Sequence, residues 1–174
     1  MRVVSLLASA TEMIAELGCL HQLVGRSHEC DFPEAVRALP VVSRVQINID
    51  TSSAEIDAQV KALSRAAQEE SAPMNALSIY SIDTEQLQRL LPDIIFTQTQ
   101  CEVCAVSESD VTRAVAQLIV IQPRIVSLAP YRLAEVWEDV LRVGAALECA
   151  AQAEELVANY GKTLQTYEPR KRST

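Results

Sequence analysis

Two polar segments hold most of the side chains in this sequence that can bind a metal ion. His28 and Cys30 lie in one segment, and Cys101 and Cys104 lie in another, much further along the chain. Imidazole and thiolate are ligands that tetrahedral Zn²⁺ prefers, and the C-x-x-C spacing lets both sulfurs reach one ion. The four side chains therefore form a candidate zinc site if the fold brings the two segments together.

The same cysteines permit two other interpretations. A dithiol pair at Cys101 and Cys104 would make the chain a redox protein, although such a pair normally opens a helix and here a loop intervenes. Alternatively, the thiols pack in a tight loop, because free cysteine behaves as a small apolar residue. Cys19 and Cys149 stand in helical contexts, and we interpret them as packing residues.

Charged and amide side chains of these segments indicate a ligand-binding site. Arg26 and Arg44 can each make a bidentate contact with an anionic group. His28 is either a metal ligand or a loop histidine bonded to a nearby carboxylate such as that of Asp31. No nucleophile–base–orienter set is recognisable, so we expect a binding protein and not an enzyme. The candidate ligand-binding residues are Ser9, Arg26, His28, Glu29, Cys30, Asp31, Arg44, Gln98, Gln100 and Cys101.

Composition excludes several classes of function. The 174 residues include 15 Lys and Arg against 23 Asp and Glu, and the net charge of -8 argues against nucleic-acid binding. The four glycines lie too far apart for a dinucleotide fingerprint, a P-loop or a nucleophile elbow. No stretch approaches the ~18 apolar residues of a transmembrane helix. The apolar run at 3–7 is too short for a secretion signal, and the five cysteines fit a reducing compartment, so we expect a cytoplasmic chain.

Short apolar runs alternate with helical patterns, which indicates a parallel sheet with helices on both faces. Strands are predicted at 2–7, 22–25, 40–43, 76–80, 93–97 and 124–128, and helices at 9–17, 52–70, 85–91, 108–118, 133–147 and 151–165. Ser9 and Glu12 have the spacing of a helix-capping box. The letters RIVSL at 124–128 nearly repeat RVVSL at 2–6, which suggests two equivalent strands. We expect four or five parallel strands, with ligand bound beyond their carboxyl ends.

Several stretches resemble one known protein family. The opening RVVSLLASATE is similar to the start of the substrate-binding proteins for iron–siderophores and vitamin B12. The stretches GRSHECDFP from Gly25 and QCEVCAVSE from Gln100 resemble the cobalamin-binding subgroup, whose members carry His-Glu-Cys and Cys-x-x-Cys-Ala-Val at these places. The letters DII after LLP at 90–92 are similar to the family's L-x-P-D-hydrophobic strand. The resemblance covers nearly the whole chain.

The resemblance implies two α/β lobes joined by one long helix, with the ligand held between the lobes. This chain would supply the first lobe at 1–149, the joining helix at 150–166 and a polar tail at 167–174. Cobalamin, or another corrinoid, would be a bound ligand and not a catalytic cofactor, and an ABC importer permease would be the partner. Relatives are periplasmic or lie at the cell surface.

A lobe without its partner would expose its ligand-facing side. Large exposed apolar patches tend to associate, so we expect weak binding by a monomer, and either a homodimer or a separately encoded second half. The alternatives that remain are a zinc-binding protein with the His28, Cys30, Cys101 and Cys104 site and a cytosolic dithiol redox protein.

Overall fold

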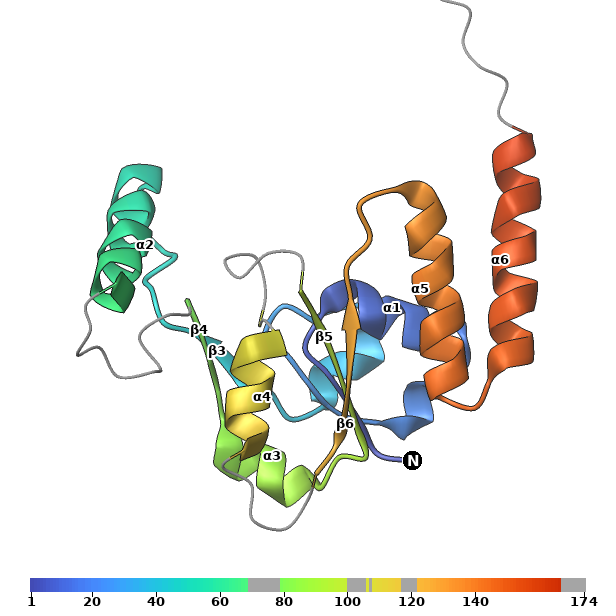
Figure 1. The fold of residues 1–174 in the computed structure, drawn as a ribbon, viewed down its shortest axis with the longest axis horizontal. Helices are drawn as coiled ribbons and strands as arrows, with labels where there is room; N and C mark the ends of the chain where they lie inside the picture. Colours follow the sequence, from blue (N-terminus) through green and yellow to red (C-terminus); the bar gives the residue numbers. More distant parts are fainter. Residues whose placement is uncertain (69–78, 100–105, 107, 117–121, 167–174) are drawn as a thin grey trace, which may run out of the picture.

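Four parallel strands form the central sheet (Figure 1). The computed structural model describes residues 1–68, 79–99, 106, 108–116 and 122–166. The strands of this sheet are β1 (Val3–Ser5), β2 (Leu23–Arg26), β5 (Ile94–Gln98) and β6 (Arg124–Leu128). They lie in the order β2-β1-β5-β6, and each neighbouring pair is parallel. The predicted α/β fold built on a parallel sheet is confirmed.

Helices cover both faces of this sheet (Figure 1). The described helices are α1 (Ala8–Glu16), α2 (Ser53–Gln68), α3 (Thr84–Leu90), α4 (Glu108–Ala116), α5 (Leu133–Ala146) and α6 (Ala150–Gln165), and all of them except α2 pack on the sheet or on its helices. Successive strand residues point to opposite faces. On β5, Ile94 and Phe96 therefore join a core with α1, α5 and α6, whereas Ile95 joins a second core with α3 and α4. Within the described ranges, no helix is long and apolar enough to span a membrane.

A two-stranded antiparallel ribbon lies outside the parallel sheet. Its strands are β3 (Ser43–Val45) and β4 (Tyr80–Ile82). These strands begin near the ends of the strands predicted at 40–43 and 76–80, and Val41 makes a parallel bridge to Arg26. Residues 76–78 lie outside the described residues. The four parallel strands agree with the four or five that were expected, whereas the antiparallel ribbon was not predicted, because an apolar run indicates a strand but carries no information on its direction.

The predicted capping box of Ser9 and Glu12 is wrong. The residue that precedes α1 is Leu7, whose side chain offers no oxygen, and Ser9 lies exposed in the first turn. The hydroxyl group of Thr11 donates to Ser5 Oγ at 2.9 Å and so holds the helix to the end of β1. A bond between the strand and the helix therefore takes the place of the local cap.

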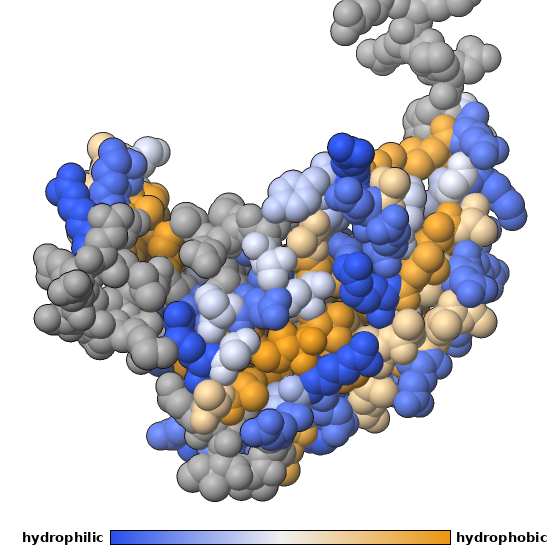
Figure 2. Space-filling model, in the orientation of Figure 1, coloured by the Kyte–Doolittle hydropathy of each residue, from blue (hydrophilic) through white to orange (hydrophobic). Residues whose placement is uncertain are grey.

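Helix α6 packs along the outer side of α5 (Figure 1). A Cβ atom at Gly144 would lie less than 3.0 Å from that of Ala153, so the two helices approach very closely there. The rings of Trp137 and Tyr160 stack with centroids 5.5 Å apart. Figure 2 shows that apolar surface remains visible along these two helices, to which the exposed side chain of Leu164 belongs. The long final helix was predicted, and it lies outside the sheet as expected.

Helix α2 stands apart from both helix layers in Figure 1. Its apolar residues Ile56, Val60 and Leu63 have helical spacing, yet each is only half-buried. Asp57 and Lys61 form an ion pair one turn apart, with 2.6 Å between Oδ2 and Nζ. The predicted helix at 52–70 is therefore confirmed, whereas its apolar side is only partly packed against the rest of the chain.

Candidate functional site

The carboxyl ends of the four parallel strands meet at one edge of the sheet. Ser5 pairs with Arg26 on one side and with Phe96 on the other. The backbone N–H of Ser27 donates to the carbonyl of Ser5 at 2.8 Å, which continues the pairing past the end of β2. Loops that follow parallel strands at such an edge are the usual ligand site of α/β sheets. We call residues 6–9, 27–33, 99 and 129–132 the strand-end edge.

Arg26 holds the loop that follows β2. Its Nη1 donates to the carbonyls of Ser27 at 3.1 Å and Cys30 at 3.0 Å. Its Nη2 donates to the carbonyl of Arg37 at 3.3 Å. A guanidinium that satisfies loop carbonyls in this way positions the loop, which is a different use from the bidentate anion contact that we predicted for it.

His28 lies between this loop and the β3–β4 ribbon. Its Nδ1 is 2.8 Å from Ser43 Oγ, and its backbone N–H donates to the same oxygen at 3.1 Å. The ring also contacts that of Tyr80, with centroids 5.2 Å apart, and Nε2 lies 3.3 Å from a carboxylate oxygen of Glu29. Burial lowers the pKa of His28, the carboxylate of Glu29 opposes this, and the charge of Arg26 adds to it. The ring is therefore held in its neutral form at neutral pH.

Cys30 points toward the sheet and not toward the ribbon. It is 1% exposed, and its Sγ donates to the carbonyl of Ser5 at 3.7 Å and lies 3.4 Å from Ser27 Oγ. Cys101 and Cys104 lie outside the described residues. In the part of the chain that the structure describes, no group of three or more His, Cys, Asp or Glu side chains is placed to hold a metal ion. The zinc site therefore stays a prediction.

The other predicted ligand-binding residues are dispersed. Ser9, Glu29 and Asp31 are exposed on the strand-end edge, and Gln98 is buried at the end of β5. Arg44 lies away from this edge, on the ribbon, with its Nη2 3.2 Å from Asp83 Oδ2 and its side chain 76% exposed. Gln100 and Cys101 lie outside the described residues. The structure thus gathers residues from the loop after β2 with the start of α1 and the end of β5, but not Arg44.

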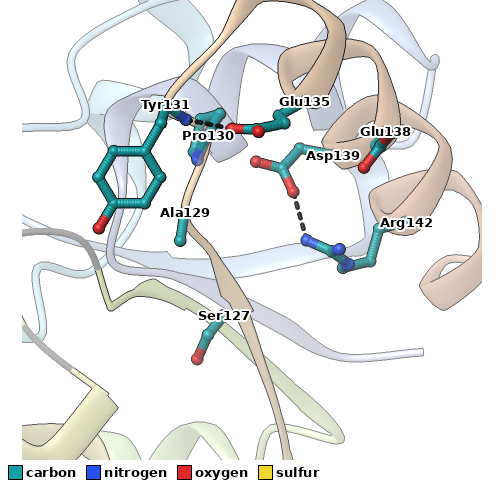
Figure 3. A pocket seen from close by; sticks show the side chains of 8 residues that line it. All are labelled: Ser127, Ala129, Pro130, Tyr131, Glu135, Glu138, Asp139 and Arg142. Carbon is teal, nitrogen blue, oxygen red and sulfur yellow. Dashed lines mark hydrogen bonds and ion pairs between the residues drawn. The ribbon is translucent and has the colours of Figure 1, made fainter.

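A cavity of about 310 Å³ opens where β6 ends and α5 begins (Figure 3). It is lined by Ser127, Ala129, Pro130, Tyr131, Glu135, Glu138, Asp139 and Arg142. Figure 3 shows the carboxylate of Asp139 pointing into the cavity, with Oδ1 paired to Arg142. Its Oδ2 is buried and has no hydrogen-bond partner among the described residues. Burial raises the pKa of Asp139, and the guanidinium of Arg142 partly opposes this.

Two exposed aromatic side chains on the strand-end edge were not predicted as ligand-binding residues from the sequence. Phe32, in the loop after β2, is 60% exposed, and Tyr131, in the loop after β6, is 73% exposed. A signal for Tyr131 existed, because the RIVSL strand that precedes it nearly repeats the strand before Ser9. No signal existed for Ser43, because its bonds to His28 depend on how the ribbon lies against the loop.

Comparisons with known proteins identify the fold. No protein-family model matches the chain. No curated protein matches it either. A solved periplasmic heme binding protein from Pseudomonas aeruginosa has a TM-score of 0.62 at 18% identity, over 94% of this chain and 44% of its own. The periplasmic vitamin B12 binding protein BtuF of Vibrio cholerae has a TM-score of 0.59 at 18% identity, over 94% of this chain and 48% of its own. The periplasmic heme binding protein HutB of Vibrio cholerae has a TM-score of 0.61 at 17% identity, over 98% of this chain and 51% of its own.

The chain spans about half the length of these solved structures. The shared part is one α/β lobe with the long helix that follows it. At these identities the likeness concerns the fold alone. The chain has the fold of one lobe of a periplasmic substrate-binding protein.

Proposed function

We propose that this chain is a ligand-binding lobe for a corrinoid, acting in ABC-type import. The fold supports a binding role, because solved proteins with this lobe are described as binding heme or vitamin B12. The HECDFP and CEVCAV stretches support the corrinoid in particular, through their resemblance to the cobalamin-binding subgroup. A permease of an ABC importer would be the partner that receives the ligand.

The observation that carries this proposal is the composition of the strand-end edge. Phe32 and Tyr131 expose aromatic rings there, on the same edge that carries the exposed polar side chains of Ser9 and Glu29. Ligand sites combine apolar surface with a few polar groups that fix orientation. A flat macrocycle with an apolar face and polar substituents fits such an edge, because its face can stack on the rings while its rim meets the polar groups.

Charge favours a corrinoid over heme. The edge and the adjoining cavity carry the carboxylates of Glu29, Asp31, Glu135 and Glu138, and the whole chain has a net charge of -8. Heme has two propionate groups that these carboxylates repel, and the guanidinium of Arg26 is already bonded to loop carbonyls. The side-chain amides of cobalamin are uncharged and donate hydrogen bonds, which exposed carboxylates accept.

Titration of the chain with cyanocobalamin and, separately, with hemin tests this proposal. We expect cyanocobalamin to bind and hemin to bind at least about tenfold more weakly, a difference of about 1.4 kcal/mol. Because one lobe offers only one wall to the ligand, we expect a dissociation constant above about 1 μM for a monomeric sample. Absorbance changes of the chromophore and calorimetry would both report the binding.

Matched variants locate the site. Tyr131→Ala should weaken cyanocobalamin binding about tenfold, since it removes a stacking surface. Leu141→Ala is the control, because Leu141 is also exposed but lies on α5, outside the strand-end edge. Preference for hemin would contradict the corrinoid assignment while leaving a macrocycle-binding lobe. Failure of both ligands to bind at about 1 mM would contradict the proposed function itself.

A further inference from the structure

Two buried cysteines that are 130 positions apart in the sequence lie against each other. The Sγ atoms of Cys19 and Cys149 are 3.2 Å apart. Both residues are 5% exposed, and both are free thiols. Cys19 follows α1 and precedes the short 3₁₀ helix Leu20–Gln22, and Cys149 immediately precedes α6. The pair therefore joins the first helix of the lobe to the start of its last helix.

The backbone holds both residues in place. The N–H of Cys19 donates to the carbonyl of Ile14 at 3.0 Å, and that of Cys149 donates to the carbonyl of Gly144 at 2.8 Å. The carbonyl of Cys149 accepts in turn from Ala153 at 3.2 Å, in the first turn of α6. A disulfide needs its sulfurs at about 2.05 Å, so the two Sγ atoms have to approach by only about 1.2 Å. A change in side-chain torsion moves a sulfur atom by a distance of this order.

We propose that Cys19 and Cys149 form a reversible disulfide that fastens α6 to the end of α1. The oxidant is a disulfide-bearing molecule, either a small disulfide or a protein disulfide. The thiolate of one cysteine attacks a sulfur of the oxidant, and the first oxidant thiolate leaves. The thiolate of the other cysteine then attacks the sulfur of the first cysteine in the mixed disulfide and releases the second oxidant thiolate. Two thiols are oxidised, one disulfide is reduced to two thiols, and the two protons pass to the leaving groups.

The surroundings of the pair make this exchange slow and its product durable. Burial and the neighbouring thiol of Cys19 raise the pKa of Cys149 to about 11, so little thiolate is present at neutral pH. Thiolate is the attacking form, so the reaction of this thiol accelerates as the pH rises toward that value. The same burial shields the completed bond from reductants. A disulfide of this kind persists in an oxidising compartment, whereas in a reducing compartment the two cysteines stay as free thiols.

Cys30 provides an internal control. It is also a free, buried cysteine, at 1% exposure. Its Sγ contacts are the oxygens of Ser27 and Ser5, so its described neighbours include no second sulfur. Burial alone therefore does not create the proposed pair; the Sγ–Sγ approach does. This inference is independent of the proposed ligand.

The experiment is oxidation of the complete chain with oxidised glutathione at about pH 8.5, where more of the Cys149 thiol is ionised than at neutral pH. The sample is then alkylated in denaturant, digested and analysed by mass spectrometry. We expect one cross-linked species that contains Cys19 and Cys149, is two hydrogens lighter than the sum of its peptides and disappears on reduction. Recovery of both residues as alkylated free thiols, or pairing of either with a different cysteine, would overturn the proposal.

Thermal unfolding provides a second readout. A disulfide that closes so long a loop should raise Tm by at least about 5 °C on oxidation. Cys149→Ala should abolish this rise, and Cys30→Ala should leave it intact. If Cys149→Ala does not fold, the peptide map of the unsubstituted chain still decides the question. An equal Tm before and after quantitative cross-linking would refute the fastening role.

Discussion

The close contact between α5 and α6 makes Gly144 a sensitive test of the architecture. The substitution Gly144→Ala adds one methyl group inside α5, where the new Cβ would lie less than 3.0 Å from the Cβ of Ala153. It would also lie 3.2 Å from the carbonyl oxygen of Cys149. Neither atom can rotate away. The Cβ of Ala153 is attached directly to the backbone of α6, and the carbonyl oxygen of Cys149 is itself a backbone atom. The two helices therefore have to separate.

Two effects of opposite sign set the size of the change. Replacing glycine by alanine inside a helix stabilises it by about 1 kcal/mol. Overpacking a tight contact costs about 1–3 kcal/mol, and the rigidity of this contact places it near the upper end. The net loss for Gly144→Ala is then about 2 kcal/mol, which lowers Tm by about 4–8 °C in a chain of this size.

Gly161→Ala is the matched control. Gly161 also lies inside a helix, α6, but a Cβ there would meet nothing within 4 Å. This variant keeps the helix-propensity gain without the clash, so its free energy of unfolding should rise by about 1 kcal/mol. The difference between the two variants isolates the cost of the contact.

Urea unfolding followed by tryptophan fluorescence measures these changes. Trp137 is the only tryptophan, and its ring stacks on Tyr160 across the interface between α5 and α6. The double variant Gly144→Ala with Ala153→Gly should be more stable than the sum of the two single changes predicts, because it removes the clash. If Gly144→Ala proved as stable as Gly161→Ala, the close packing of α6 on α5 would be refuted.

Two further predictions concern pH. Burial lowers the pKa of His28. The carboxylate of Glu29 raises this pKa and the charge of Arg26 lowers it, and the folded state on balance favours the neutral ring. Its contribution to stability is present above the ordinary value of 6.5 and is lost as the pH falls below it, so His28→Asn should flatten the fall in the free energy of unfolding between about pH 7 and pH 5. An equally steep fall in this variant would contradict the assignment. Burial raises the pKa of Asp139 despite Arg142, so the folded state favours the protonated acid, and stability is lost as the pH rises above the ordinary value of 3.8. The stability of the unsubstituted chain relative to Asp139→Asn should therefore decrease from about pH 4 to pH 7 in urea unfolding series, and a constant difference would show that burial does not perturb this carboxyl group.

The sequence by itself determined the elements and their layering. The apolar run at 124–128 became β6 without change, because a short run rich in β-branched residues favours an extended strand. Asp83 caps α3, the helix predicted at 85–91, and its carboxylate accepts from the backbone N–H of Gln86 at 2.9 Å. Such features depend on residues within a few positions of one another. Spacing along the chain is therefore enough to predict them.

Only the tertiary structure decided which distant groups meet. Arg26 was expected to bind an anion, whereas in the structure its guanidinium donates to three backbone carbonyls of the segment that follows β2. Ser9 was expected to cap α1, yet Thr11 anchors that helix through Ser5. Cys19 and Cys149 were each interpreted as packing residues in separate helical contexts. They contact each other although they are 130 positions apart in the sequence. Periodicity specifies the conformation of a segment, whereas contacts between segments depend on sheet order and helix packing, which local spacing does not encode.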